Sequence, residues 1–226
     1  MKALIVDSDT MKVISLVFMQ SEGWKREVYL SEKITNLGAD KLPSFIGVFI
    51  VSATQQNIDL LKRQLADPIF KEYHIFFTTS IDETMIKYLA ECDTFNVIKN
   101  LYEIFMDYQA ITPACMTLGF EEGYKLSLDE KDWPAGTEDI MMRTLDGFAG
   151  MCVSLRKSPM IKYLVSSKIC WKMSSILQQR LTDHKRSNML DFEGANRSLV
   201  LITDRKEDPV TPLMFGWTYM DMLHEV

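Results

Sequence analysis

Short apolar runs recur through the first half of the chain, separated by stretches in which apolar residues are spaced further apart. The clearest run, FIGVFIV at 45–51, is continuous, as expected of a strand buried on both faces of a parallel sheet. Three further runs have strand composition: 2–6, 27–30 and 73–78. Between the runs, apolar residues recur every three or four positions, which predicts helices at 11–20, 55–66 and 82–92.

Strands that alternate with helices of about ten residues favour a parallel sheet with helices on both faces. We therefore predict a doubly wound α/β domain over residues 1–112. Within it, residues 95–108 fit the helical and the strand period equally well, and the two readings stay open.

The pattern changes after residue 112, because prolines and glycines punctuate 113–136 and mark a domain boundary. Residues 137–192 then have helical spacing. Thr137 is positioned to cap a first helix, and Pro159 suits the first turn of a second. Three elements close the chain: a strand at 198–203, a charged turn at 204–212 and an aromatic helical run at 217–226. We expect 113–226 to be a mostly helical α/β segment, cut from something longer.

The composition is that of an ordinary globular chain: 226 residues, 47% apolar and 25% charged. A net charge of −6 argues against binding to nucleic acid or to anionic lipid. No apolar run reaches the ~18 residues of a membrane helix, and the first residues do not form a secretory signal. We therefore expect a cytoplasmic protein whose cysteines, which form no CxxC pair, are buried and reduced: Cys92, Cys115, Cys152 and Cys170.

Asp7 and Asp9 are the sharpest candidates for catalysis. They follow the first strand as Asp-Ser-Asp-Thr, which resembles the first motif of haloacid-dehalogenase phosphatases, where one Asp attacks phosphorus and the second handles the proton and Mg²⁺. Asp204 and Asp208, after a later strand, are placed to add a metal-binding pair. The simpler interpretation is that acidic residues after a strand cap the next helix. A Mg²⁺-dependent phosphatase is kept as the alternative function.

A response-regulator receiver is a second alternative for the same domain. Its acidic pair, switch residue and lysine can be assigned: Asp7 and Asp9, Thr78 or Thr79, and Lys99. However, the third strand ends on Ser52, where the phospho-acceptor carboxylate belongs. The domain would then be a phospho-independent scaffold that shares only the wound sheet.

Motifs for other chemistry are absent from the sequence. There is no GxxxxGK[ST], GxGxxG, HExxH or GxSxG. The three histidines lie far apart and have no ligand-like neighbours: His74, His184 and His224. We therefore predict no metal and no cofactor.

Residues 198–226 carry the most unusual pattern, SLVLITDRKEDPVTPLMFGWTYMDMLHEV. An apolar strand leads into a turn whose prolines fix the backbone. Asp204, Arg205 and Asp208 are placed to tie this turn by charge-assisted hydrogen bonds. Because no nucleophile stands beside a base here, we interpret the segment as a rigid structural turn.

The same residues closely resemble the signature of the Sec1/Munc18-like (SM) family, D-R-x-x-D-P-x-T-P-L before an aromatic-rich helix. The matching positions are Asp204, Arg205, Asp208, Pro209, Thr211, Pro212, Leu213, Trp217 and Tyr219. WTYMDMLHE looks most like the vacuolar protein sorting branch of the trans-Golgi network and endosomes. The likeness covers essentially all 226 residues, although 119–136 match poorly. It implies SM domain 1 at 1–112 and the first segment of SM domain 2 at 113–226, without domain 3.

The resemblance implies a non-enzymatic protein that binds a syntaxin (a Qa-SNARE) and the SNARE complex, and guides SNARE assembly in vesicle fusion. It also implies a monomer without cofactor, recruited peripherally to Golgi and endosomal membranes through syntaxin. In several SM proteins, a pocket on the outer face of domain 1 receives the N-terminal peptide of the syntaxin. The matching positions are Ile81, Ile86, Leu89, Ile98 and Leu101, with Glu103 at the rim to pair with a basic residue of the peptide. For Leu89 and Leu101, ordinary core packing is an equal alternative.

Overall fold

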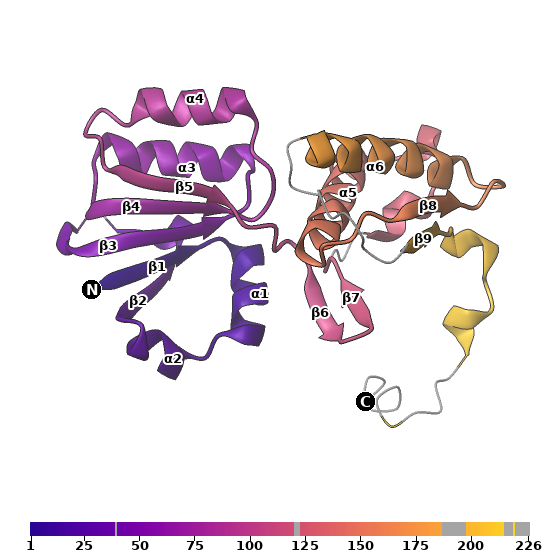
Figure 1. Ribbon diagram of the computed structural model, residues 1–226, viewed down its shortest axis with the longest axis horizontal. Coiled ribbons are helices and arrows are strands. Elements are labelled where there is room, and N and C mark those ends of the chain that lie inside the picture. Colours follow the sequence, from indigo (N-terminus) through magenta and orange to yellow (C-terminus); the bar gives the residue numbers. More distant parts are fainter. Residues whose placement is uncertain (39, 120–122, 187–197, 215–218, 220–226) are drawn as a thin grey trace. The chain divides into compact units, whose positions relative to one another are not determined.

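A computed structural model describes residues 1–38, 40–119, 123–186, 198–214 and 219. The chain forms two compact units (Figure 1). The first unit comprises Met1–Gly119 with Asp146–Leu155, and the second comprises Phe120–Leu145 with Arg156–Val226. The predicted boundary near residue 112 falls within the first unit, and the assignment of the two SM domains stays a prediction.

A five-stranded parallel sheet with the order β2-β1-β3-β4-β5 forms the centre of the first unit (Figure 1). Its strands are β1 (Lys2–Val6), β2 (Val28–Lys33), β3 (Leu42–Val51), β4 (Phe70–Phe77) and β5 (Ile98–Glu103). The parallel α/β prediction is confirmed, and the ambiguous stretch 95–108 contributes an edge strand. In the described part of the chain, β5 pairs only with β4. Its register shifts where Lys99 is inserted between Ile98 and Asn100.

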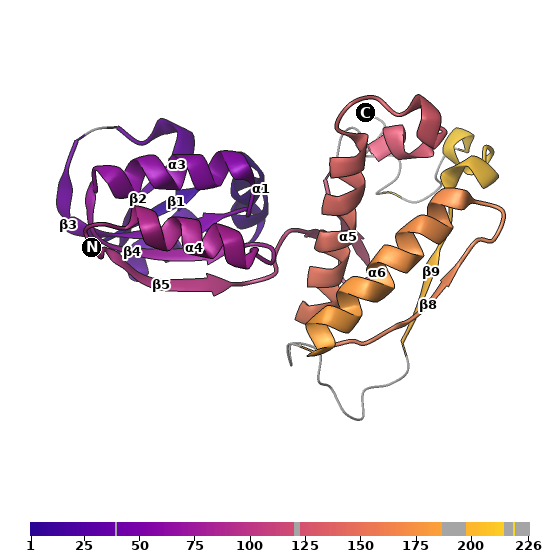
Figure 2. The ribbon, with the colours of Figure 1, turned by 90° about the horizontal axis from the view of Figure 1, so that it is seen from above.

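The helices of this unit are α1 (Ser8–Val17), α2 (Gln20–Lys25), α3 (Gln55–Ala66) and α4 (Glu83–Cys92). α3 and α4 lie side by side against one face of the sheet (Figures 1 and 2). Their apolar stripes pack on alternate residues of β3 and β4, because side chains of a strand point to opposite faces in turn. The fully buried members of this core include Phe49, Tyr73, Ile75, Phe77, Ile58, Leu61, Leu65 and Leu89.

An aromatic cluster fills the middle of this core. The Phe49 ring stacks on Tyr73 with centroids 5.2 Å apart and meets Phe70 edge-on at 6.0 Å. Gly47 gives the rings room, because a Cβ there would lie 2.7 Å from Phe70 and 2.8 Å from Phe49. The Tyr73 hydroxyl accepts a hydrogen bond from the Ile69 amide at 3.0 Å, so its polar end is also satisfied.

Helix α2 and a pair of short strands in the first unit were not predicted from the sequence. Strands β6 (Gln109–Thr112) and β7 (Cys115–Thr117) form a short antiparallel hairpin. Helix α5 (Thr137–Ser154) confirms the first helix predicted after the boundary, with Thr137 as its first residue and not its cap, and its last turns belong to the first unit. There Gly147 allows close approach, since a Cβ would lie 2.7 Å from the Asp107 carbonyl oxygen.

The second unit combines α6 (Lys168–Arg186) with a parallel strand pair, β8 (Met160–Tyr163) and β9 (Leu199–Ile202). β9 confirms the predicted strand at 198–203. The helix predicted to begin at Pro159 is wrong over its first part, because residues 160–163 pair with β9 and the helix begins only at Lys168. The predicted helix at 217–226 lies outside the described residues apart from Tyr219, whose side chain is exposed. Within the described chain, none of the helices is long and apolar enough to cross a bilayer.

The four cysteines are free thiols, and they differ in exposure. Cys152 and Cys170 are buried as expected, whereas Cys92 is half-buried and Cys115 is exposed, which corrects the expectation for those two residues. Burial raises the pKa of the Cys152 thiol to about 11. Because the thiolate is the reactive form, we expect Ellman's reagent to modify Cys115 first and Cys152 only after unfolding. A Cys115→Ser variant should lose the fast phase, and a fast phase that persists would contradict this assignment.

Candidate functional site

Asp7 lies at the carboxyl end of β1, where the sequence suggested a catalytic carboxylate. Its side chain is 8% exposed. Oδ1 accepts from the Thr10 amide at 2.7 Å, and Oδ2 accepts from the Ser52 amide at 2.7 Å and from Asn57 Nδ2 at 2.8 Å. Burial alone would raise the pKa of this carboxyl, but the hydrogen bonds from Ser52 and Thr10 outweigh it, so the pKa lies below its ordinary value.

This geometry does not support the phosphatase. Both oxygens of Asp7 already cap α1 and join the ends of β1 and β3, so neither faces a substrate. Asp9 lies on the surface of α1, 3.8 Å from Lys12 Nζ. Among the described residues, no three His, Cys, Asp or Glu side chains are grouped to hold a metal ion. Asp7 is therefore a structural residue.

The receiver assignment also fails on geometry. Ser52 stands at the end of β3 with its amide committed to Asp7. Lys99, the expected strand-five lysine, is exposed and donates to the Asn96 carbonyl at 3.1 Å. Of the two candidates for the switch residue, Thr78 is buried and Thr79 is half-buried. The domain shares the wound sheet of a receiver and lacks its phosphorylation chemistry.

The signature turn at 204–213 is tied by its own side chains, as predicted. Asp204 accepts from the Lys206 amide at 3.0 Å and caps a short 3-10 helix, Arg205–Glu207. Arg205 Nη1 lies 3.3 Å from Asp208 Oδ2, and Asp208 Oδ1 accepts from the Thr211 amide at 3.0 Å. The hydrogen bonds from Thr211, together with Arg205, hold the pKa of Asp208 below its usual range.

Two prolines lie within or next to the segment that the Asp208–Thr211 hydrogen bond closes. Pro212 stands in the 3-10 helix Thr211–Leu213, and Pro209 follows Asp208. Trp217 lies outside the described residues, so its predicted place in the following helix stays a prediction. The hydrogen bonds and the ion pair described for this turn hold its backbone in place, which is a structural role.

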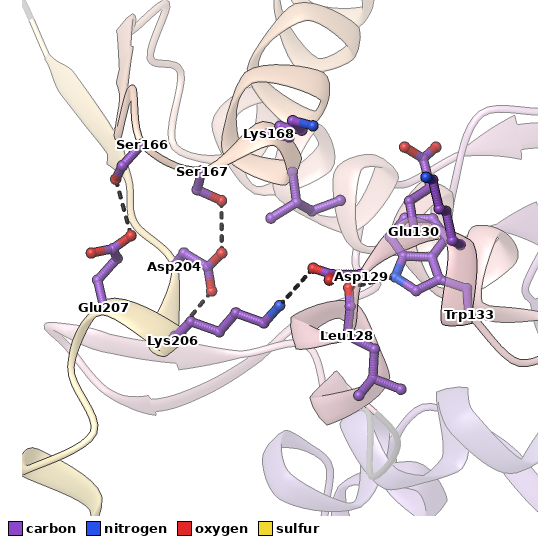
Figure 3. Close-up of a pocket in the computed structure, with 12 residues that line it drawn as sticks. Leu128, Asp129, Glu130, Trp133, Ser166, Ser167, Lys168, Asp204, Lys206 and Glu207 are labelled. Atoms are coloured by element: carbon purple, nitrogen blue, oxygen red, sulfur yellow. Dashed lines mark hydrogen bonds and ion pairs between the residues drawn. The ribbon is translucent and has the colours of Figure 1, made fainter.

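A cavity of about 480 Å³ lies beside the signature turn in the second unit (Figure 3). On one side, Ser167 donates to Asp204 at 2.7 Å and Ser166 donates to Glu207 at 3.0 Å, so the start of α6 is fastened to the turn. Trp133 lies on the opposite side (Figure 3). Lys206 of the turn connects the two sides of the cavity, because its Nζ lies 3.1 Å from Asp129 Oδ1.

Lys172 adds a second tie from α6 to the segment that contains Trp133. Its Nζ pairs with Glu130 and Glu138 and lies 5.3 Å from the centre of the Trp133 ring. The pKa of Lys172 is raised, mainly by the hydrogen bond to Glu130. Residues 128–133, which we expect from the sequence to match the SM pattern poorly, therefore contact its signature turn through Asp129 and Lys206. This contact was not foreseen, and the closely spaced acidic residues between Leu128 and Trp133 were its only signal in the sequence.

The six residues of the expected peptide pocket gather around α4 and β5 of the first unit. Leu89 has no exposed surface and Ile81 is 8% exposed, so both belong to the core beneath this surface. Ile98 and Leu101 are half-buried and pack against that core. Ile86 is 38% exposed, which makes it the most accessible apolar side chain of the six.

Two carboxylates hold the loops at the ends of α4. Glu103 Oε1 accepts from the Ile81 amide at 2.8 Å. Asp93 accepts from the Val97 and Ile98 amides at 2.9 and 3.0 Å. Asp93 was missed in the sequence, although an Asp just before a strand is a common turn signal. We refer to Ile86, Ile98 and Leu101, together with the carboxylates of Glu103 and Asp93, as the α4–β5 surface.

Comparison with known proteins gives a consistent result over the whole chain. The sequence profile of the Sec1 family matches residues 2–226. Over its full length the chain is 34% identical to vacuolar protein sorting-associated protein 45 of Dictyostelium discoideum and 33% identical to the Arabidopsis thaliana homolog. It covers 38% and 40% of those two proteins, well under half of their length.

Solved structures agree with the sequence comparison. The whole chain superposes on the SM protein Vps45 with a TM-score of 0.86 at 31% identity, covering 42% of that chain. It also superposes on Vps45 in complex with the Qa SNARE Tlg2 with a TM-score of 0.88 at 32% identity, covering 39% of that chain.

Proposed function

The chain belongs to the Sec1 family, and from that premise we propose that it binds a syntaxin of the trans-Golgi and endosomal type and guides SNARE assembly. The observation that carries the proposal is that the whole of this chain is similar to part of a Vps45 structure that contains the Qa SNARE Tlg2. Because the chain spans 38% of the Dictyostelium discoideum relative, the activity of a whole SM protein is part of the proposal. The proposed role is non-enzymatic and uses no cofactor.

The α4–β5 surface is the proposed docking site for the N-terminal peptide of the syntaxin. Ile86 supplies an exposed apolar contact, and the half-buried Ile98 and Leu101 extend it along β5. Apolar anchors of this kind carry most of the affinity in peptide recognition, because their burial is favourable without strict geometry. Ile81 and Leu89 would support this surface from below.

Binding to syntaxin would also explain how the chain reaches membranes. We propose a cytoplasmic monomer that is recruited to Golgi and endosomal membranes through its partner. Neither nucleic acid nor direct insertion into lipid enters this function, in keeping with the net charge of −6.

Ile86→Arg is expected to weaken binding of the syntaxin N-terminal peptide by at least about tenfold, because burying an unpaired guanidinium costs several kcal/mol. Ile86 is partly exposed, so the fold should be unaffected. Calorimetric titration of the 226-residue chain with the peptide measures the loss.

Leu16→Arg is the matched control, because Leu16 is an exposed apolar residue of α1, away from the α4–β5 surface. It should bind the peptide as the wild type does. Equal affinity of the wild type and Ile86→Arg would remove the α4–β5 surface from the proposal. Absence of binding by a folded wild type would count against peptide docking as a whole.

A further inference from the structure

Glu103 connects the end of β5 to the turn that precedes α4. The Ile81 amide donates to Glu103 Oε1 at 2.8 Å, and the Ile81 side chain is buried in the core. Asp82, the residue between this bond and the helix, makes no side-chain capping hydrogen bond. The Glu103 carboxylate therefore anchors this turn through the Ile81 amide.

Ile86 follows the anchored turn at once. Its amide donates to the Asp82 carbonyl at 3.1 Å, in the first turn of α4. A change in the position of the turn therefore moves the start of the helix and Ile86 with it. Figure 2 shows α4 next to β5, and the anchored turn leads directly into this helix.

The opposite end of α4 is built in the same way. Asp93 accepts from the Val97 and Ile98 amides, which holds the connection from the helix to β5. A carboxylate thus fixes each loop that joins α4 to the sheet. In both cases the carboxylate accepts from backbone amides of the first unit itself, so its hydrogen bonds hold the loop in position.

We propose that Glu103 is a positioning residue for the syntaxin peptide, acting through the hydrogen bond that its Oε1 accepts from Ile81. This inference rests on the proposed function and replaces the role first expected for Glu103, a charge pair with a basic residue of the peptide. The two roles differ in what they require of the side chain. Positioning the turn requires an oxygen that accepts the Ile81 hydrogen bond, and the charge pair requires the negative charge.

Two substitutions separate these requirements. Glu103→Gln keeps an acceptor oxygen and loses the charge, whereas Glu103→Ala loses both. Loss of one hydrogen bond should weaken peptide binding in Glu103→Ala by about three- to tenfold, and Glu103→Gln should stay within about twofold of the wild type. Glu91→Gln, on the exposed side of α4, is the control for the same change in net charge.

Amide hydrogen exchange of the chain without peptide gives a second readout. The Ile81 amide should exchange faster in Glu103→Ala and at the wild-type rate in Glu103→Gln. Equal losses of affinity in the Gln and Ala variants would overturn the proposal in favour of the charge pair. Unchanged Ile81 exchange in Glu103→Ala would also overturn it, independently of peptide binding. A wild type that fails to bind the peptide would overturn the proposed docking and this proposal with it.

Discussion

Asp7→Ala is expected to lower the free energy of unfolding of the first unit by about 3 kcal/mol or more, because hydrogen bonds to a charged acceptor contribute ~1.5–3 kcal/mol each. The substitution leaves the Ser52 amide, the Thr10 amide and Asn57 Nδ2 without their acceptor. Since domains are stable by only about 5–15 kcal/mol, this is a large share. Amide exchange in β3 and β4 measures the opening of this unit directly.

Asp9→Ala is the matched control for Asp7→Ala. Asp9 makes an exposed ion pair with Lys12, and such pairs contribute about 0–1 kcal/mol. An Asp7→Ala variant as stable as Asp9→Ala would contradict the structural role of Asp7. Mg²⁺-dependent phosphate release that is lost in Asp7→Asn would instead restore the phosphatase.

Acid should destabilise the wild type in a way that the Asp7→Ala variant does not show. The pKa of Asp7 is lower in the folded chain than in the unfolded chain, so its contribution is complete above the unfolded pKa of about 4. The contribution is lost as the pH falls through the lower, folded pKa. Between pH 5 and pH 2, the difference in stability between wild type and variant should therefore shrink. A constant difference would show that Asp7 does not titrate as proposed.

Phe49→Ala is expected to cost about 3–5 kcal/mol, the usual range when a large core side chain is truncated. Phe49 is fully buried, and its ring contacts both Tyr73 and Phe70. The neighbouring strands and helices cannot close around the space, because β3 is paired on both sides. Urea unfolding followed by circular dichroism, together with exchange in β3 and β4, measures the loss.

Phe95→Ala serves as the control for Phe49→Ala, since Phe95 is 61% exposed. Its effect should stay within about 0.5 kcal/mol. Phe49→Leu, which keeps most of the volume, should fall between the two. A Phe49→Ala variant that unfolds at the wild-type urea concentration would show that the aromatic cluster does not limit the stability of this unit.

The sequence was most informative where a long pattern and the tertiary structure agree. β3 and α3 were predicted because continuous strand composition and a full helical stripe leave little ambiguity. β8 was misread as helix, because a run of four residues from Met160 fits either period and its partner lies at Leu199, far along the chain. The hairpin of β6 and β7 is equally short, and only pairing across the turn reveals it.

The peptide site stays a prediction, and the sequence could not give the arrangement of its residues. Resemblance to the SM family brought together Ile81, Ile86 and Glu103, and they lie around the same helix and strand. The exposure of Ile86 depends on the rotation of α4 against α3, where Lys62 donates to the Tyr88 hydroxyl at 2.7 Å. The hydrogen bond that Glu103 accepts from the Ile81 amide depends on how close the turn before α4 lies to the end of β5. Neither property is local in the sequence.

The insertion of Lys99 into β5 bears on how the protein avoids self-association. A regular edge strand offers a row of free amides and carbonyls on which another chain can add a strand, which is a route to aggregation. The register shift at Lys99 interrupts that row and places a charged side chain on it. Strand addition to this edge is therefore disfavoured, even though the edge borders an apolar surface. A partner at the α4–β5 surface would have to be selected by its side chains, and an arbitrary extended peptide would find no template there.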